Sequence, residues 1–137
     1  MFYTYHRDTF FKISELFKAK PMSGTIDKRL NILCPVELTL SLLSTKWKAL
    51  VMRDLLDGRK RFSQLQKSVT GISQKVLTAN LRSMEQDGLL TREVFPEVPP
   101  RVEYELTELG YSLKGIIDAM AQWGNYYRAY RAGSTAG

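Results

Sequence analysis

Residues 61–106 read RFSQLQKSVTGISQKVLTANLRSMEQDGLLTREVFPEVPPRVEYEL, and this stretch decides the fold. Ser63 can cap a short helix over Gln64–Val69. After a glycine-containing turn, Ser73 can cap a second helix that runs to about Asp87. The first half of the stretch therefore predicts two short helices joined by a tight turn.

The second half of the stretch predicts a hairpin. Leu89–Phe95 and Arg101–Leu106 are strand-like runs, and the second alternates apolar with charged residues. Between them, the proline-rich segment 96–100 forms a rigid tip that cannot pair further. Arg61-Phe62 is too short for more than an edge strand. Two helices, a turn, a third strand and a hairpin make a mainly α (α+β) winged helix-turn-helix.

Helices are predicted on both sides of this stretch. Pro35–Leu43 and Lys46–Leu56 precede it, and Thr107 can cap a long helix to about Tyr130. The apolar residues of the long helix step by four and three, which is the spacing of a seam between two helices. We expect this seam to build a homodimer. Its residues are Leu109, Leu113, Ile116, Met120, Trp123 and Tyr127.

The helix that begins after Ser73 has two faces. Leu77, Leu81 and Met84 form a buried face, with Val76 beside them. The outer face holds hydrogen-bonding and small side chains without an acid, as expected of a helix that reads base edges in the major groove of double-stranded DNA. The residues predicted to read bases are Ser73, Gln74, Lys75, Thr78, Ala79 and Arg82.

The net charge of +6, from 20 bases and 14 acids, lies wholly in residues 46–92, which hold ten bases and four acids. Basic side chains outside the reading face should contact phosphates and add affinity without sequence choice. These predicted backbone contacts are Lys46, Lys48, Arg59, Lys60 and Arg61. Arg101, at the base of the hairpin tip, either enters a minor groove or pairs with Glu97 or Glu103.

Composition excludes several classes of protein. With one cysteine and one histidine in 137 residues, we expect no internal disulfide, no metal site of the usual kind, no cofactor and no catalytic residues. No apolar run reaches the length of a membrane span, and no secretion signal is recognisable, so we expect a cytoplasmic protein without a membrane partner. Cys34 precedes a helix start, where a thiol can be activated, but a small buried residue is the simpler interpretation.

The chain is expected to divide into an extension over residues 1–33, a domain over residues 34–131 and a flexible tail over residues 132–137. The extension holds an amphipathic helix over Asp8–Lys18. Residues 1–21 either reflect an upstream start codon or add to the dimer contact, and both interpretations stay open.

Several short motifs closely resemble the HxlR family of bacterial regulators, a group within the MarR-like winged-helix proteins. They are Cys34-Pro35-Val36-Glu37, Lys46-Trp47, Gly71-Ile72-Ser73-Gln74, Asp87-Gly88-Leu89, residues 96–104 and Leu106-Thr107-Glu108-Leu109-Gly110. The resemblance covers residues 34–131 and implies homodimers that bind pseudo-palindromic operators and repress or activate nearby genes. Some similar members sense electrophiles, oxidants or aldehydes through a cysteine near the position of Cys34.

These observations together predict a dimeric, sequence-specific transcriptional regulator that is not an enzyme, and a repressor in particular. Its effector would be an electrophile that modifies Cys34, or a small ligand bound between the dimer and DNA-binding parts. The alternative is a winged-helix interaction module whose basic face binds an acidic protein partner.

Overall fold

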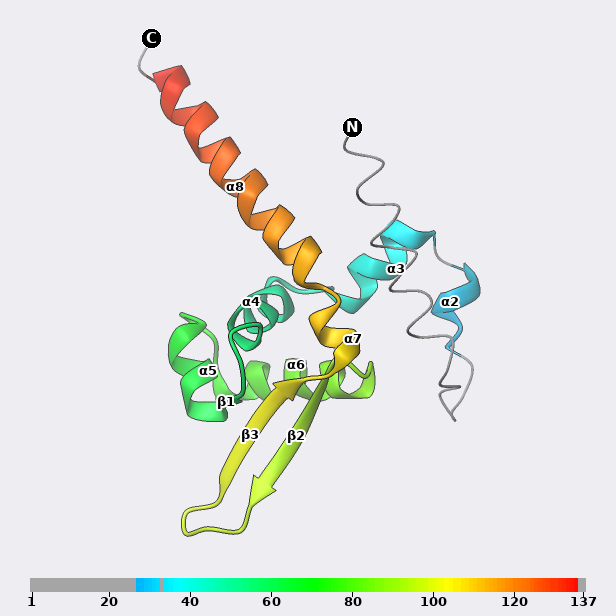
Figure 1. The fold of residues 1–137 in the computed structure, drawn as a ribbon, viewed down its shortest axis with the longest axis vertical. Coiled ribbons are helices and arrows are strands. Elements are labelled where there is room, and N and C mark those ends of the chain that lie inside the picture. The colour runs from blue at the N-terminus through cyan, green and yellow to red at the C-terminus, as the bar shows by residue number, and fades with distance from the viewer. Residues whose placement is uncertain (1–26, 33, 136–137) are drawn as a thin grey trace. The chain divides into compact units, whose positions relative to one another are not determined.

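The computed structural model describes residues 27–32 and 34–135 of the chain (Figure 1). The chain divides into two compact units, Met1–Cys34 and Pro35–Gly137. The first contains the short helix α2. The expected helix over residues 8–18 lies outside the described residues. The elements are α2 (Arg29–Ile32), α3 (Pro35–Leu42), α4 (Lys46–Leu55), β1 (Lys60–Arg61), α5 (Phe62–Ser68), α6 (Gln74–Gln86), β2 (Leu90–Phe95), β3 (Arg101–Leu106), α7 (Glu108–Tyr111) and α8 (Lys114–Thr135).

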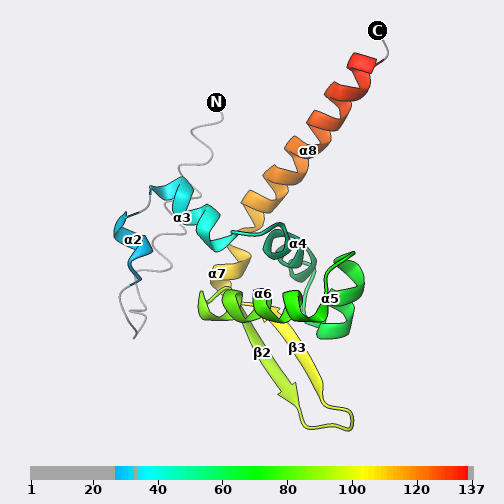
Figure 2. The ribbon, with the colours of Figure 1, turned by 180° about the vertical axis from the view of Figure 1, so that it is seen from behind.

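The second unit contains a small antiparallel sheet with strand order β1-β3-β2. Strands β2 and β3 pair along their whole length, from Leu90 opposite Leu106 to Phe95 opposite Arg101. Strand β1 is an edge strand, as expected, although it begins one residue earlier, at Lys60. In both views the β2–β3 hairpin, which we call the wing, extends away from α4, α5 and α6 (Figures 1 and 2). The predicted winged helix-turn-helix is confirmed.

Helix α5 starts two residues before the predicted start. It begins at Phe62, and the residue that precedes its first turn is Arg61, so Ser63 does not cap it. The side-chain oxygen of Gln64 accepts a hydrogen bond from the Arg61 backbone N–H at 2.8 Å. This contact satisfies a backbone donor at the point where strand pairing ends, and the helix therefore begins directly after β1.

Helix α6 follows the prediction closely. The Ser73 side chain accepts from the backbone N–H of Val76 at 3.2 Å and caps the helix. Leu77, Leu81 and Met84 are buried in the core, as predicted. Val76 is 36% exposed, so its predicted burial was wrong, and Asn80 is buried instead. The Asn80 side chain accepts from the Thr45 hydroxyl at 2.8 Å and so ties α6 to the start of α4.

The predicted long C-terminal helix is confirmed as α8, but it starts at Lys114, and the residues predicted as its first turn form the separate short helix α7. Thr107 caps α7, as expected: its hydroxyl accepts from Gly110 N–H at 3.1 Å and donates to the Gly88 carbonyl at 2.6 Å. A tight turn at Ser112 and Leu113 then separates α7 from α8. Gly110 is pressed against the Leu89 backbone, since an added Cβ would lie 2.1 Å from that carbonyl oxygen. The close packing of α7 on the chain before β2 therefore fixes its direction.

Helix α8 leaves the core after its first turn. Ile117 is buried, whereas every residue from Asp118 to Ser134 is exposed (Figure 1). The helix continues to Thr135, so residues 132–135, expected as part of a tail, are helical. Across the described ranges, none of the helices combines the length and apolar character needed to cross a membrane.

Candidate nucleic-acid interface

The outer face of α6 presents the side chains that the sequence predicts as base-reading. Ser73, Gln74, Lys75, Ala79 and Arg82 are exposed. Thr78 is half-buried, and its hydroxyl donates to the Gln74 backbone carbonyl at 2.8 Å. Within the part of the chain that the structure describes, no hydrogen bond or ion pair ties the side chains of Gln74, Lys75 or Arg82 to another element. The donors of this face are therefore available to a ligand.

A cleft of about 690 Å³ separates α6 from the wing. Arginine side chains line it from three directions: Arg61 from the edge strand, Arg82 from α6, and Arg92 and Arg101 from the wing. Two acids, Glu85 and Glu97, also line it. A concave surface with several guanidinium groups suits a polyanion, because arginine binds phosphate oxygens through its planar fork of donors.

Arg92 was not among the predicted contacts. The strand register places it opposite Tyr104, on the same side of the hairpin as Leu90 and Leu106. This side faces the core near the base of the wing, where Leu90, Leu106 and Tyr104 are buried. The alternation of side chains from Leu90 onward would have placed Arg92 toward the cleft.

Of the two predicted roles of Arg101, the structure shows the ion pair with neighbouring glutamates. Its guanidinium lies 3.2 Å from a Glu97 carboxylate oxygen and 3.9 Å from a carboxylate oxygen of Glu103. It also lies over the Phe95 ring, 4.2 Å from the ring centroid. These contacts hold the side chain at the base of the tip.

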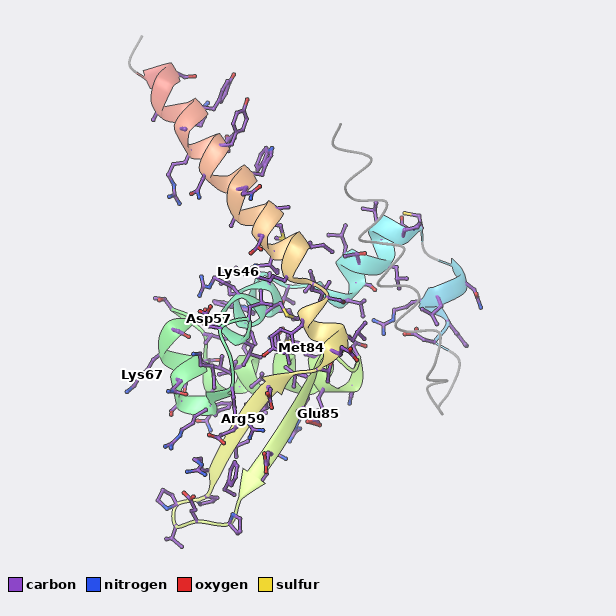
Figure 3. The ribbon with its side chains drawn as sticks, in the orientation of Figure 1. Lys46, Asp57, Arg59, Lys67, Met84 and Glu85 are labelled. Atoms are coloured by element: carbon purple, nitrogen blue, oxygen red, sulfur yellow. The ribbon has the colours of Figure 1, made fainter. Side chains whose placement is uncertain are left out.

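Two of the predicted phosphate contacts are engaged within the protein. Arg59 Nη1 lies 2.6 Å from Glu93 and 3.4 Å from Glu103, and Nη2 lies 3.0 Å from Glu105. Figure 3 shows Arg59 against the strands of the wing. Lys48 is only 6% exposed, and its ammonium donates to Ser83 Oγ at 2.8 Å and to Ser44 Oγ at 3.3 Å. The prediction that both reach phosphates is therefore not supported by their positions.

The other three predicted phosphate contacts keep accessible charges. Lys46 and Arg61 are exposed, and Lys60 is half-buried. The Lys46 ammonium lies 4.4 Å from the centroid of the Trp47 ring, and Trp47 packs against the core. This contact orients Lys46 without neutralising its charge.

The predicted dimer seam is split between the core and the surface. Leu113 is buried in the core, and Leu109 is half-buried and packs against it. The remaining four residues are exposed, at 36% for Ile116, 52% for Met120, 61% for Trp123 and 48% for Tyr127. Two further exposed aromatic residues of α8, not predicted as part of the seam, are Tyr126 and Tyr130.

Cys34 is exposed and directly precedes α3. Helix α3 buries none of its residues, and its exposed apolar side chains include Val36 and Leu40. The interpretation that Cys34 packs under the dimer helices stays a prediction, since the exposure is that of a single chain.

Comparisons with known proteins agree on one family. Residues 42–131 match the family model described as "HxlR-like helix-turn-helix". An HTH-type transcriptional regulator of Methanothermobacter thermautotrophicus, itself described as uncharacterized, is 47% identical over 102 residues, which cover 74% of this chain and 78% of that protein.

Two solved structures resemble this chain in both fold and sequence. The redox regulator HypR in its reduced form superposes with a TM-score of 0.68 at 41% identity, covering 73% of this chain and 99% of HypR. The quinone-bound form of YodB from Bacillus subtilis superposes with a TM-score of 0.59 at 35% identity, covering 69% and 99% of the two chains.

Proposed function

Because the chain belongs to the HxlR-like helix-turn-helix family and is a transcriptional regulator of MarR-like type rather than an enzyme, we propose that it binds a pseudo-palindromic operator as a homodimer. We further propose that it represses the genes beside that operator. The observation that carries the proposal is the outer face of α6, which carries no acid from Ser73 to Arg82, is largely exposed there and is fixed in place by buried residues on its opposite side.

Helix α6 would enter the major groove and read base edges. The Gln74 amide can form two hydrogen bonds with adenine. Arg82 or Lys75 can donate hydrogen bonds to the acceptors of guanine. The small Ala79 and the methyl group of Thr78 suit contact with the thymine methyl. Buried Leu77, Leu81 and Met84, together with the Thr45–Asn80 hydrogen bond, support a rigid placement of these side chains.

The cleft between α6 and the wing would hold one sugar-phosphate strand. Arg61, Arg82 and Arg92 line it, and none of the three has an ion pair among the described residues. Lys46 and Lys60, which do not line the cleft, would add phosphate contacts outside it. Arg59 and Lys48 are left out of this set because carboxylates and hydroxyls already engage them.

The exposed face of α8 would form the dimer. Every residue of α8 from Asp118 to Ser134 is exposed, although helices in proteins gain most of their stability from packing. An exposed apolar stripe on such a helix indicates a missing partner. The face that would be covered holds Ile116, Met120, Trp123 and Tyr127, with the Trp123 and Tyr127 rings stacked 5.4 Å apart. Two-fold symmetry would place the two α6 helices in major grooves about one helical turn apart.

Cys34 would make the regulator responsive to electrophiles or oxidants. The exposure of Cys34 supports this role, since a modifying reagent can reach the thiol. Two of the similar solved proteins are a redox regulator and a quinone-bound regulator. Treatment with a quinone or diamide should release DNA from the wild type and not from Cys34→Ser; equal release from both would remove this role.

The test of the central proposal is sequence selectivity. In a gel shift, the protein should bind the DNA upstream of its own gene more tightly than random DNA of the same length. At the same salt concentration, the ratio of the two affinities should be well above about tenfold. Equal affinity for the two DNAs would overturn the regulator proposal and favour a basic module for an acidic protein partner.

A further inference from the structure

The tip of the wing exposes an apolar side chain at its outermost point. Val98 is fully exposed and lies between Pro96 and the pair Pro99-Pro100. Three prolines in five residues restrict the backbone, so the side chain is presented at small entropic cost. An exposed valine on a stiff hairpin is a preformed contact for a shallow apolar surface.

The tip offers few hydrogen-bond donors. Proline has no backbone N–H, so only Glu97 and Val98 carry one between residues 96 and 100. The Glu97 N–H already donates to the Phe95 carbonyl at 2.8 Å. The acceptors on the floor of the minor groove therefore have at most one backbone donor available from this tip.

The charged groups at the base of the tip neutralise each other. Arg101 lies 3.2 Å from Glu97 and stacks over Phe95, which keeps its guanidinium away from the outermost position. The same ion pair offsets the charge of Glu97, the only carboxylate of the tip, whose side chain remains half-exposed. What the tip presents to DNA is shape and apolar surface.

The position of the cleft places the tip at a minor groove. In a duplex one sugar-phosphate strand separates each major groove from the adjacent minor groove. If α6 occupies the major groove and the arginine-lined cleft holds that strand, the wing on the other side of the cleft lies over the minor groove. This step rests on the DNA-binding function proposed above.

We propose that Val98 is the minor-groove contact of the wing and selects base pairs that lack the 2-amino group of guanine. An apolar side chain fits against an A·T pair, whereas the guanine 2-amino group would project into it and lose its water without gaining an acceptor. Val98 is thus a specificity-determining residue outside the reading helix, and Arg101 positions the tip rather than reading DNA.

The test removes or adds the 2-amino group without changing the major groove. An operator selected from random DNA with the full-length protein is scanned one base pair at a time, with inosine for guanine and 2-aminoadenine for adenine. At a position flanking each α6 half-site, adding the group should weaken wild-type binding by about fivefold or more, and removing it should restore the affinity.

Variants assign the effect to a side chain. Val98→Ala should reduce the effect of the 2-amino group to less than about twofold while the preference for the α6 half-sites remains. Because Val98 is fully exposed, this substitution removes no packing contact. Val94→Ala is the matched control, because Val94 is also exposed on the wing but lies within β2 rather than at the tip, and it should behave as wild type.

The outcomes separate the two proposals. A Val98→Ala scan identical to wild type, or loss of the discrimination in Arg101→Ala alone, would overturn the role of Val98. A scan without any 2-amino effect, on an operator that is still preferred over random DNA, would also overturn it and leave the regulator proposal intact. Failure to select any preferred DNA would overturn the regulator proposal and the minor-groove contact with it.

Discussion

The guanidinium of Arg59, the residue before β1, lies 2.6 Å from a carboxylate oxygen of Glu93 on β2, on the far side of β3 in the sheet. Glu93 and Glu103 are directly opposite each other in the register of the wing, where two like charges destabilise a strand pair. The hydrogen bonds that Arg59 donates to Glu93, and then to Glu105 and Glu103, raise its pKa above the usual value. Arg59 therefore counterbalances the outer carboxylates of the wing.

Salt dependence should distinguish Arg59 from a phosphate contact. Arg61→Ala should reduce the slope of log affinity against log salt by about 1.8 per dimer, since each of the two chains loses one phosphate contact worth about 0.9. Arg59→Ala should leave that slope unchanged, because carboxylates engage its charge. Fluorescence anisotropy with operator DNA between about 50 and 200 mM salt measures both slopes. An equal loss of slope in the two variants would show that Arg59 reaches a phosphate.

Arg82 and Gln74 should determine base selectivity. Arg82→Ala and Gln74→Ala should each reduce the preference for operator over random DNA by about 1–3 kcal/mol. Lys60→Ala should instead weaken binding to both DNAs alike, since a phosphate contact carries no sequence information. Competition gel shifts give the ratio directly. A selective loss in Lys60→Ala would show that the assignment of the reading face is wrong.

The oligomeric state should depend on the exposed face of α8. Trp123→Glu places a charge where we expect the seam and should give a monomer, whereas the wild type should sediment at twice the chain mass of 15.7 kDa. Gln122→Glu is the matched control, because Gln122 lies on α8 outside the seam spacing, and it should remain dimeric. Sedimentation velocity separates the two states, and a dimeric Trp123→Glu would place the interface elsewhere.

Gly110 should be intolerant of any side chain. Gly110→Ala would force a methyl group to 2.1 Å from the Leu89 carbonyl oxygen, so the free energy of unfolding should fall by at least about 2 kcal/mol. Gly115→Ala meets open space on α8 and should leave stability unchanged or raise it by up to about 1 kcal/mol. Urea denaturation of the two variants checks the contrast; similar stabilities would mean that α7 can shift away from Leu89.

Local patterns were sufficient to predict most elements of the fold. Ser73 and Thr107 cap helices as expected, and Leu77, Leu81 and Met84 are buried as their spacing indicates. The break between α7 and α8 was missed, because the apolar steps of four and three continue through Ser112 and Leu113. The contact that fixes α7, between Gly110 and the Leu89 backbone, joins segments that are distant along the chain, and no local pattern encodes it.

The site was predicted less completely, because basic residues were counted along the chain without asking which face of a helix or strand each one occupies. Lys48 shares helical spacing with Val51, Met52 and Leu55, which would have indicated an inward position. Asn80 likewise lies on the spacing of Leu77 and Leu81. The pairing of Arg59 could not be read from spacing, since its partners Glu93, Glu103 and Glu105 are brought to it by the sheet.

The separation of the two faces of α6 has a consequence for how such a regulator changes its target. Asn80 and three buried apolar residues anchor the helix, while Gln74, Lys75 and Arg82 have no ties to other elements among the residues described. The outward side chains can therefore be exchanged at little cost to folding. After a gene duplication, a few surface substitutions on α6 could therefore give one copy a new operator while its fold stays the same.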